Sequence, residues 1–240
     1  MMLQSAVPPS EIRAFLAENP KRRARDAADA LGIAEAQLVA AGIGHGTTRI
    51  AAHPDGIIPA AERLGEVMAL TRVDACVHEK VGTYSDYHPG EHAAMTLAEN
   101  IDLRIFPSHW VHAFAVETET EQGPRRSLQI FDAAGDAVHK IHLRDGSTHD
   151  AWGTIVADLA VADQGDTQPV EARKPVEGAK SRTDKADALR DEWARLTDTH
   201  QFLRLCTRLK MNRLGAYRIA GAPWVRPLTP DAADAMLQAV

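Results

Sequence analysis

The sequence is poor in cysteine and has no long apolar run. Its two cysteines, Cys76 and Cys206, lie far apart and form no Cys-x-x-Cys pair, so neither a disulfide framework nor a thiolate metal site is indicated. No window approaches the roughly 18 apolar residues of a membrane-spanning helix, and the first residues contain no signal-peptide core. These absences predict a cytoplasmic protein with reduced thiols and no membrane partner.

Aromatic residues and excess basic charge are also scarce. The formal net charge is −6 and 5% of the residues are aromatic, so neither a general attraction to nucleic acid nor a stacking platform for single strands is predicted. The P-loop, GxSxG and GxGxxG motifs are missing, and "VHEKVG" (77–82) lacks the second histidine of the HExxH zincin motif. What is present is 45% hydrophobic residues over 240 positions, enough for a sizeable core.

Hydrophobic periodicity predicts helices first and an antiparallel sheet second. Residues 10–42 carry alanine and leucine at helical spacing, and from about Thr47 the period changes to two. The turn "DAAGDA" (132–137) predicts a hairpin in which Leu128 and Ile130 face the same way. Short connections favour an antiparallel meander, and residues 88–100 are predicted to form a short helix. Strands are predicted at 47–52, 67–72, 76–84, 101–106, 110–119, 127–132 and 137–144.

The remainder of the sequence is predicted to be helical, with one interruption. Residues 147–160 resume a helical pattern, whereas 163–184 are polar, rich in proline, glycine and lysine, and without periodicity. The predicted fold class is therefore α+β. Residues 1–162 form a helical lead and a large antiparallel sheet, 163–184 form a linker, and 185–240 form a C-terminal helical segment.

One histidine of the C-terminal segment has an unusual position. If Thr197 or Asp198 caps the next helix, His200 points about 160° away from the centre of the apolar stripe of that helix. In the first helical turn the dipole would keep the ring neutral, which is the form that binds metals. A solvated surface histidine is the alternative, and from the residues alone it is the more common case. The stripe consists of Phe202, Leu205, Cys206 and Leu209.

The other histidines offer weaker metal sites. Two pairs spaced by three lie on predicted strands and point to opposite faces, so neither pair can chelate. His88 and His92 have helical spacing, but Pro89 and Gly90 between them disfavour a helix. The two strand pairs are His109 with His112 and His139 with His142.

The segment "IDLRIFPSHW" (101–110) places an arginine beside an aromatic ring. On the predicted strand, Arg104 and Phe106 share the face opposite the aliphatic residues. A guanidinium next to a ring suits a planar anionic ligand, because one group binds a carboxylate and the other stacks. The alternative is a surface arginine paired with Asp102 or Glu117.

Residues 21–42 also resemble a helix-turn-helix. Basic residues precede the first helix and would contact phosphates, which makes a DNA-binding regulator an alternative function. The second helix, however, offers only Gln37 as a reader of base edges. A small helical bundle packed on the sheet is therefore favoured, and nucleic acid is not an expected partner. The basic residues are Lys21, Arg22, Arg23 and Arg25.

Five long motifs follow one another along the sequence: "RARDAADALGIAEAQLVAAGIG", "LGEVMALTRVDACVHEKVGTY", "IDLRIFPSHWVHAFAV", "SLQIFDAAGDAVHKIHL" and "LTDTHQFLRLCTRL". Taken together and in this order, they resemble the HemS/HmuS/ChuS family of bacterial haemin-utilisation proteins. The resemblance runs from about residue 20 to 225. Members of that family have two similar halves, each a helical lead followed by an antiparallel sheet, with haem in a cleft that involves both halves.

The resemblance implies a role for four residues and a cofactor. His200 in "LTDTHQFL" corresponds to the axial ligand of the haem iron, which would make it the metal ligand here. Arg104 and Phe106 correspond to residues that line the opposite, distal side of the haem. Arg213 falls where the family has a basic residue near the porphyrin.

The resemblance stops before the end of the family's second half. After "GAPWVRPL" (221–228) the family continues into a second sheet, whereas this sequence ends with "TPDAADAMLQAV". We therefore expect a first repeat and the helical start of a second, with weaker haem binding unless a second copy of the chain completes the cleft. The implied function is cytoplasmic haem binding in iron acquisition. The chain would hand haem to an oxygenase or transporter, or degrade it with an external reductant; the alternatives are the DNA-binding regulator and a non-binding remnant.

Overall fold

The computed structural model describes residues 7–73 and 76–239. The chain divides into two compact units between Arg173 and Lys174. The first unit combines helices with two antiparallel sheets, and the second is helical. The α+β class predicted from periodicity is confirmed. Of the helices in the described ranges, none is both long and apolar enough to cross a membrane.

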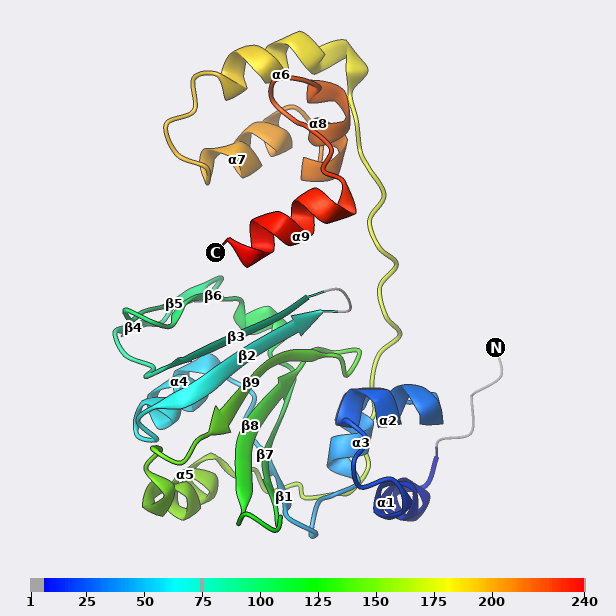
Figure 1. Ribbon diagram of the computed structural model, residues 1–240, viewed down its shortest axis with the longest axis vertical. Coiled ribbons are helices and arrows are strands. Elements are labelled where there is room, and N and C mark those ends of the chain that lie inside the picture. Colours follow the sequence, from blue (N-terminus) through cyan, green and yellow to red (C-terminus); the bar gives the residue numbers. More distant parts are fainter. Residues whose placement is uncertain (1–6, 74–75, 240) are drawn as a thin grey trace. The chain divides into compact units, whose positions relative to one another are not determined.

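The first unit begins with the predicted helical lead. Helices α1 (Pro9–Glu18), α2 (Ala24–Leu31) and α3 (Glu35–Ala40) lie together beside the main sheet (Figure 1). Gly32 ends α2 in the left-handed conformation, with φ +66°, which favours glycine at this position. Small residues allow close packing of the three helices around Ile12, Ala28 and Leu38.

The main sheet has six strands in the order β1-β7-β8-β9-β2-β3, all antiparallel (Figure 1). The predicted hairpin joins β8 to β9. The Asp132 Oδ1 atom accepts hydrogen bonds from the backbone N–H groups of Ala134 and Asp136, and Gly135 has φ +80°. The strands are β1 (Thr47–Ile50), β2 (Val67–Val73), β3 (Cys76–Gly82), β7 (His112–Thr118), β8 (Arg125–Phe131) and β9 (Ala137–Leu143).

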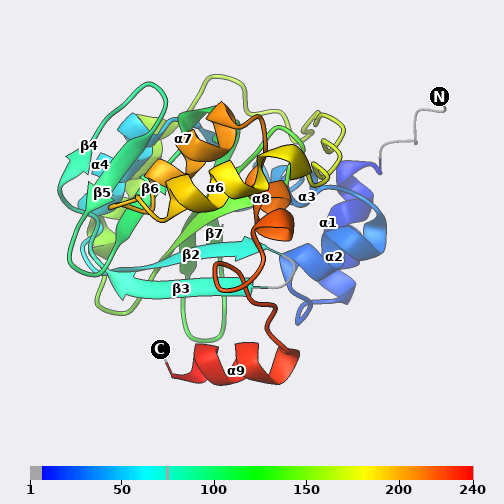
Figure 2. The same cartoon turned by 90° about the horizontal axis from the view of Figure 1, so that it is seen from above.

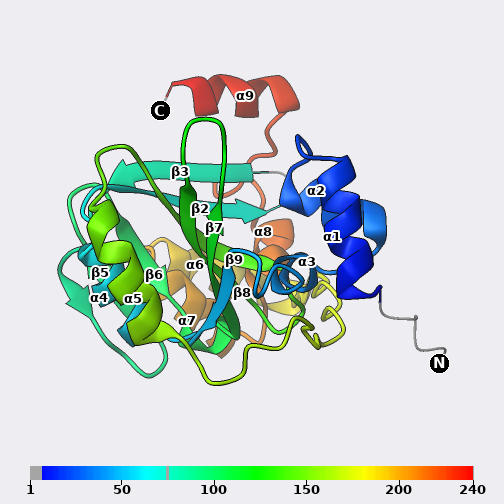
Figure 3. The ribbon, with the colours of Figure 1, turned by 90° about the horizontal axis from the view of Figure 1, so that it is seen from below.

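Both faces of this sheet are covered, each by different elements. On one face, α4 (Pro54–Glu62) and α5 (Trp152–Leu159) cover the principal core (Figures 1 and 3). Leu128 and Ile130 are fully buried there, as the alternation of the strand predicted. The other face packs Phe114 and Phe131 against α3. Short 3-10 turns span Pro107–His109 and His149–Ala151.

A small three-stranded sheet replaces the helix predicted at residues 88–100. It consists of β4 (Tyr87–His88), β5 (Ala94–Leu97) and β6 (Asp102–Ile105), in that order. Ala94 and Thr96 of β5 are completely buried, and the Thr96 hydroxyl donates to the carbonyl of Ile101. The helix prediction was wrong because pairing with β6 overrides the local preference of alanine, methionine and leucine for helix.

The second unit is built on three helices that lie side by side (Figure 2). The predicted apolar stripe of α7 is buried in the core they share, which includes Phe202, Leu205 and Cys206. A fourth helix, α9, has no buried residue. The helices are α6 (Ala186–Trp193), α7 (Gln201–Arg208), α8 (Arg213–Ala220) and α9 (Pro230–Gln238), with a 3-10 turn at Thr183–Lys185.

Residues 161–182 contain no helix and no regular strand. Their first part binds the first unit: Gln164 hydrogen-bonds the backbone of Arg49, and Arg173 forms a two-fold ion pair with Asp136. Their last part binds the second unit, where Lys180 N–H donates to the Asn212 side chain. The boundaries 1–162, 163–184 and 185–240, and their reading as repeats, stay predictions.

Candidate functional site

His200 lies at the end of the loop that joins α6 to α7. The loop is held by side chains: Thr197 N–H donates to Gln201 Oε1 at 3.2 Å, and the amide nitrogen of Gln201 returns a bond to the Thr197 hydroxyl at 3.1 Å. His200 occupies the N-cap position of α7, with φ −65° and ψ −24°. Its side chain is 79% exposed, so the ring is open to a ligand.

Neither Thr197 nor Asp198 caps α7, so the condition under which the direction of His200 was derived is not met. Helix α7 begins at Gln201, and no side-chain cap bond is formed at its N-terminus. The Asp198 carboxylate instead accepts from the backbone N–H of His200 at 2.6 Å and lies 2.7 Å from the His200 ring nitrogen Nδ1. The predicted direction of His200, away from the buried stripe, agrees with its exposure.

The contact with Asp198 fixes the tautomer of His200. An ionised carboxylate only accepts hydrogen bonds, so Nδ1 must carry the proton that it shares with Asp198. The two contacts from His200 hold the pKa of the Asp198 carboxyl below its usual range. In the neutral ring the lone pair is then on Nε2, directed away from Asp198. A histidine oriented by a carboxylate in this way is a typical metal ligand.

Arg213 lies in the same unit as His200. It is the first residue of α8, and its side chain is exposed. The N-cap Asn212 accepts from Gly215 N–H at 2.8 Å and so fixes the start of this helix. Burial raises the pKa of the Cys206 thiol, and the positive charge of Arg213 opposes that rise, which places Arg213 close to α7.

Four aromatic rings brace the helices that carry His200 and Arg213. Phe202 stacks on Tyr217 with ring centroids 5.4 Å apart, and Trp193 contacts both Phe202 and Trp224. The rings come from α6, α7, α8 and the segment after α8. No short spacing in the sequence links these four rings, so the cluster was not predicted.

Arg104 and Phe106 belong to the first unit, where the predicted alternation of β6 is confirmed. Ile101 and Ile105 are buried, whereas Arg104 and Phe106 are exposed. Arg104 forms an exposed ion pair with Asp102, as the alternative predicted, but the distance of 3.6 Å is too long for a hydrogen bond. The other predicted partner, Glu117, pairs with Arg126.

Phe106 is 52% exposed and meets the ring of His109 edge-on at 6.5 Å. Neither it nor Arg104 is engaged by a strong contact with the described residues. The structure therefore keeps the four predicted site residues as two pairs, one in each unit.

A buried polar network in the first unit, centred on His139 of β9, was not predicted from the sequence. The ring of His139 stacks on Trp110 and hydrogen-bonds the Tyr84 hydroxyl through Nε2 at 2.5 Å and the Thr71 hydroxyl through Nδ1 at 2.9 Å. A cavity of about 270 Å³ reaches Thr71, His139 and Leu103. Burial lowers the pKa of His139 to about 4 and raises that of Tyr84. The ring is therefore neutral near pH 7 and bridges two hydroxyls.

The remaining histidines form no metal site in the described part of the chain. Among residues 7–73 and 76–239, no group of three or more histidine, cysteine or acidic side chains is arranged to hold a metal ion. His88 pairs with Asp86 at 2.9 Å on a strand rather than on a helix. A haem iron is held by one or two axial protein ligands and not by a cluster of three, so this result does not bear on His200.

The helix-turn-helix interpretation of residues 21–42 has a structural obstacle. The helix that would enter a DNA groove is α3, and five of its six residues are buried: Glu35, Ala36, Leu38, Val39 and Ala40. These side chains pack against the sheet and against α1 and α2. Helix α3 therefore has no free face of the length that base reading requires.

Comparison with protein families and comparison with curated proteins point to the same kind of protein. The family model of the haemin-degrading HemS.ChuX domain matches residues 32–159. The hemin transport protein HemS of Yersinia enterocolitica is 36% identical over 207 residues, which are 85% of this chain and 59% of that protein. The chain thus spans about three fifths of the length of the curated relatives it matches.

Solved structures similar to this chain come from the same kind of protein. Holo-PhuS, a heme-binding protein from Pseudomonas aeruginosa, superposes with a TM-score of 0.88 at 36% identity, covering 97% of this chain and 69% of PhuS. ChuS, a heme oxygenase of Escherichia coli, gives a TM-score of 0.72 at 31% identity, with 88% and 62% of the two chains covered.

Proposed function

Because the chain belongs to the family of the haemin-degrading HemS.ChuX domain, we propose that it binds haem and that Nε2 of His200 is the ligand of the iron. The observation that carries the proposal is the contact between His200 Nδ1 and Asp198 at 2.7 Å. It leaves Nε2 as an exposed lone pair on a ring whose orientation is fixed. His200 is also the one histidine in the sequence after residue 149.

Three further residues are proposed to contact the haem. Arg104 has an exposed guanidinium without a short carboxylate partner, which suits a charge-assisted bond to a propionate or another oxygen ligand. Phe106 offers an exposed ring for stacking on the porphyrin. Arg213 adds a second exposed cation beside α7. Each pair is placed by its own unit, so the two pairs are tested separately.

The role of the bound haem is proposed to be iron acquisition in the cytoplasm. The relatives named above are a hemin transport protein, a heme-binding protein and a heme oxygenase. Bound haem then has one of two fates. The chain delivers it to an oxygenase or transporter, or degrades it with an external reductant. Haem supplies the oxidative chemistry when degradation takes place, and the protein supplies the ligand, orientation and charge. A second copy of the chain is a further candidate partner.

A haemin titration followed by visible absorbance tests the ligand assignment. We expect His200→Ala to remove most of the Soret shift that haemin produces with the unchanged chain. His92→Ala is the matched control, because His92 is exposed but lies in the first unit. Equal Soret shifts for the His200→Ala variant and the unchanged chain would refute the assignment.

The same preparation tests the role of the haem and the partner. Ascorbate added to the haem-loaded chain should bleach the Soret band if the chain degrades haem, and a stable band would leave delivery as its role. Light scattering before and after haemin addition measures whether two copies assemble. A mobility-shift experiment with duplex DNA is expected to show no complex, because α3 is buried.

A further inference from the structure

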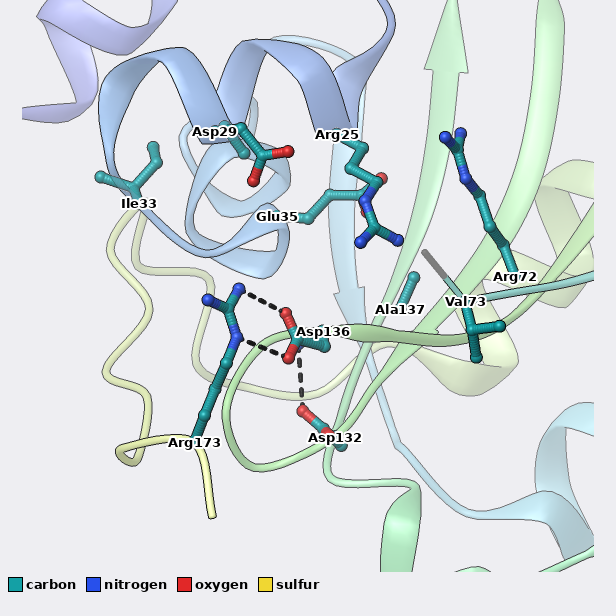
Figure 4. Close-up of a pocket in the computed structure, with 11 residues that line it drawn as sticks. Arg25, Asp29, Ile33, Glu35, Arg72, Val73, Asp132, Asp136, Ala137 and Arg173 are labelled. Carbon is teal, nitrogen blue, oxygen red and sulfur yellow. Dashed lines mark hydrogen bonds and ion pairs between the residues drawn. The ribbon is translucent and has the colours of Figure 1, made fainter. Parts of the chain in front are cut away.

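A groove with one basic end lies between α2 and the β2–β9 side of the main sheet in the first unit (Figure 4). It consists of two adjoining cavities of about 110 and 550 Å³ that share four wall residues, among them Arg25 and Arg72. Figure 4 shows the side chains of these two arginines extending from α2 and from β2 into the space between the elements. The smaller cavity has room for roughly three or four water molecules.

Arg72 is the least satisfied charge in this groove. Its Nε atom is buried and has no hydrogen-bond partner, and no hydrogen bond or ion pair joins its guanidinium to residues 7–73 or 76–239. The residue is only partly exposed. Arginine does not lose its proton in proteins, so the cost of its burial cannot be relieved by deprotonation. A buried donor that remains unsatisfied in this way indicates an acceptor that completes the site.

The surrounding charges favour an anion as that acceptor. The walls of the smaller cavity carry four cationic side chains, Arg23, Arg25, Arg72 and Lys140, against one carboxylate. That carboxylate, Glu35, is already paired with Lys140. The excess of positive charge in the smaller cavity contrasts with the formal net charge of −6 of the whole chain.

Helix α2 adds a further contribution. The cavity wall includes Ala24, the first residue of α2, and no side chain caps this helix. The free N–H groups at a helix N-terminus carry partial positive charge and bind anions.

We propose that this groove is a binding site for a phosphate group, held by the Arg72 guanidinium, by Arg23 and by the N-terminus of α2, with Arg25 adding positive charge beside them. The site is independent of the proposed haem ligands, since it uses none of His200, Arg104, Phe106 or Arg213. A tetrahedral oxyanion matches the donors in number: the guanidinium of Arg72 alone presents five N–H groups in a planar fork.

The larger cavity indicates which phosphates fit. Its far end is lined by Asp29, Asp132 and Asp136. Asp136 is occupied by Arg173 through two bonds of 2.7 Å, and Asp132 accepts backbone N–H groups through Oδ1. Asp29 is exposed. A small organic phosphate with hydroxyl or amino donors would place its phosphate at the arginines and its donors toward Asp29; inorganic phosphate would occupy the arginine end alone.

Titration calorimetry with inorganic phosphate, at constant ionic strength set with chloride, tests the site on the full chain. We expect saturable binding at one site, weakened at least about tenfold by Arg72→Gln, because one charge-assisted contact is lost. Arg63→Gln is the matched control: Arg63 is a surface arginine that pairs with Asp158 on α5, and its removal should leave the affinity unchanged. Adenosine monophosphate is titrated in parallel. If it binds more tightly than inorganic phosphate, the site is assigned to an organic phosphate. If the two bind equally, the site is assigned to the free phosphate ion.

Chemical-shift mapping of backbone amides keeps the test decisive if Arg72→Gln alters folding. Phosphate should shift the amides of residues 23–26 and 72 in the unchanged chain, and Arg23→Gln, at an exposed position, should reduce the affinity while the chain stays folded. No saturable binding, equal affinity in the Arg72→Gln variant, or shifts confined to other residues would each overturn the proposal.

Discussion

Lowering the pH from 7 to 4 is expected to destabilise the first unit through His139. The pKa of this histidine falls from its ordinary value of 6.5 to about 4, chiefly because burial disfavours the charged ring. Between these values the unfolded chain binds a proton that the folded chain does not, so acid favours unfolding. The contribution of the neutral ring is fully present above pH 6.5 and is lost as the pH falls toward 4.

The size of the effect follows from the difference between the two pKa values. At about 1.4 kcal/mol for each pH unit, His139 accounts for about 3 kcal/mol of stability lost between pH 6.5 and 4. His142, whose pKa burial and the neighbouring Lys140 also lower to about 4, contributes a similar amount. A domain of this size is stable by roughly 5–15 kcal/mol, so the two histidines together decide whether the first unit survives mild acid.

Hydrogen exchange measured by mass spectrometry on peptides from β7, β8 and β9 follows the first unit without interference from the second. His139→Gln should remove about half of the pH dependence. At pH 7 it should cost about 1–3 kcal/mol, because Thr71 or Tyr84 loses a buried partner. His142→Gln should remove the other half. A pH dependence between 6.5 and 4 that is the same in both variants as in the unchanged chain would contradict this account.

Three other changes probe the haem ligands and the helical core. Asp198→Asn keeps the loop but weakens the acceptor of the His200 ring, and we expect haemin affinity to fall about tenfold or more in an absorbance titration; an unchanged dissociation constant would mean that Asp198 only shapes the loop. Arg104→Ala should also lower haemin affinity about tenfold, while circular dichroism shows an intact sheet; Arg125→Ala, an exposed arginine of β8, serves as its control. Leu205→Ala should destabilise the second unit by about 2–5 kcal/mol in urea unfolding, because Leu205 is buried in its core, whereas Leu203→Ala, at an exposed site on the same helix, should change little.

Elements with strong periodicity were predictable because burial alone determines them. The alternation of Leu128 and Ile130 and the stripe of Phe202 and Leu205 depend only on which side of a strand or helix meets a core. The failure at residues 88–100 has the opposite cause. The segment around Ala94 is a strand because β6 pairs with it, and no local pattern records that pairing.

In the candidate site, too, features set by neighbouring residues were predictable from the sequence, and contacts between distant residues were not. The exposure of His200 was predictable from its angle to the apolar stripe of α7. The role of Asp198 was not, because a sequence does not tell whether a carboxylate accepts a hydrogen bond from the backbone or from a histidine ring. The network around His139 joins residues 55 and 68 positions apart. Arg72 likewise meets α2 only in the folded chain, so the groove has no sequence motif.

The contact between Asp198 and His200 also bears on how a helical unit can present a metal ligand by itself. The Asp198 carboxylate accepts from the ring nitrogen Nδ1, so the proton of the neutral ring is held at Nδ1 and the lone pair is on Nε2. The same carboxylate also accepts the backbone N–H of His200, so one side chain fixes both the backbone and the ring. A metal ion bound at Nε2 therefore meets a ring that is already oriented, and no proton has to leave Nε2 when the metal binds.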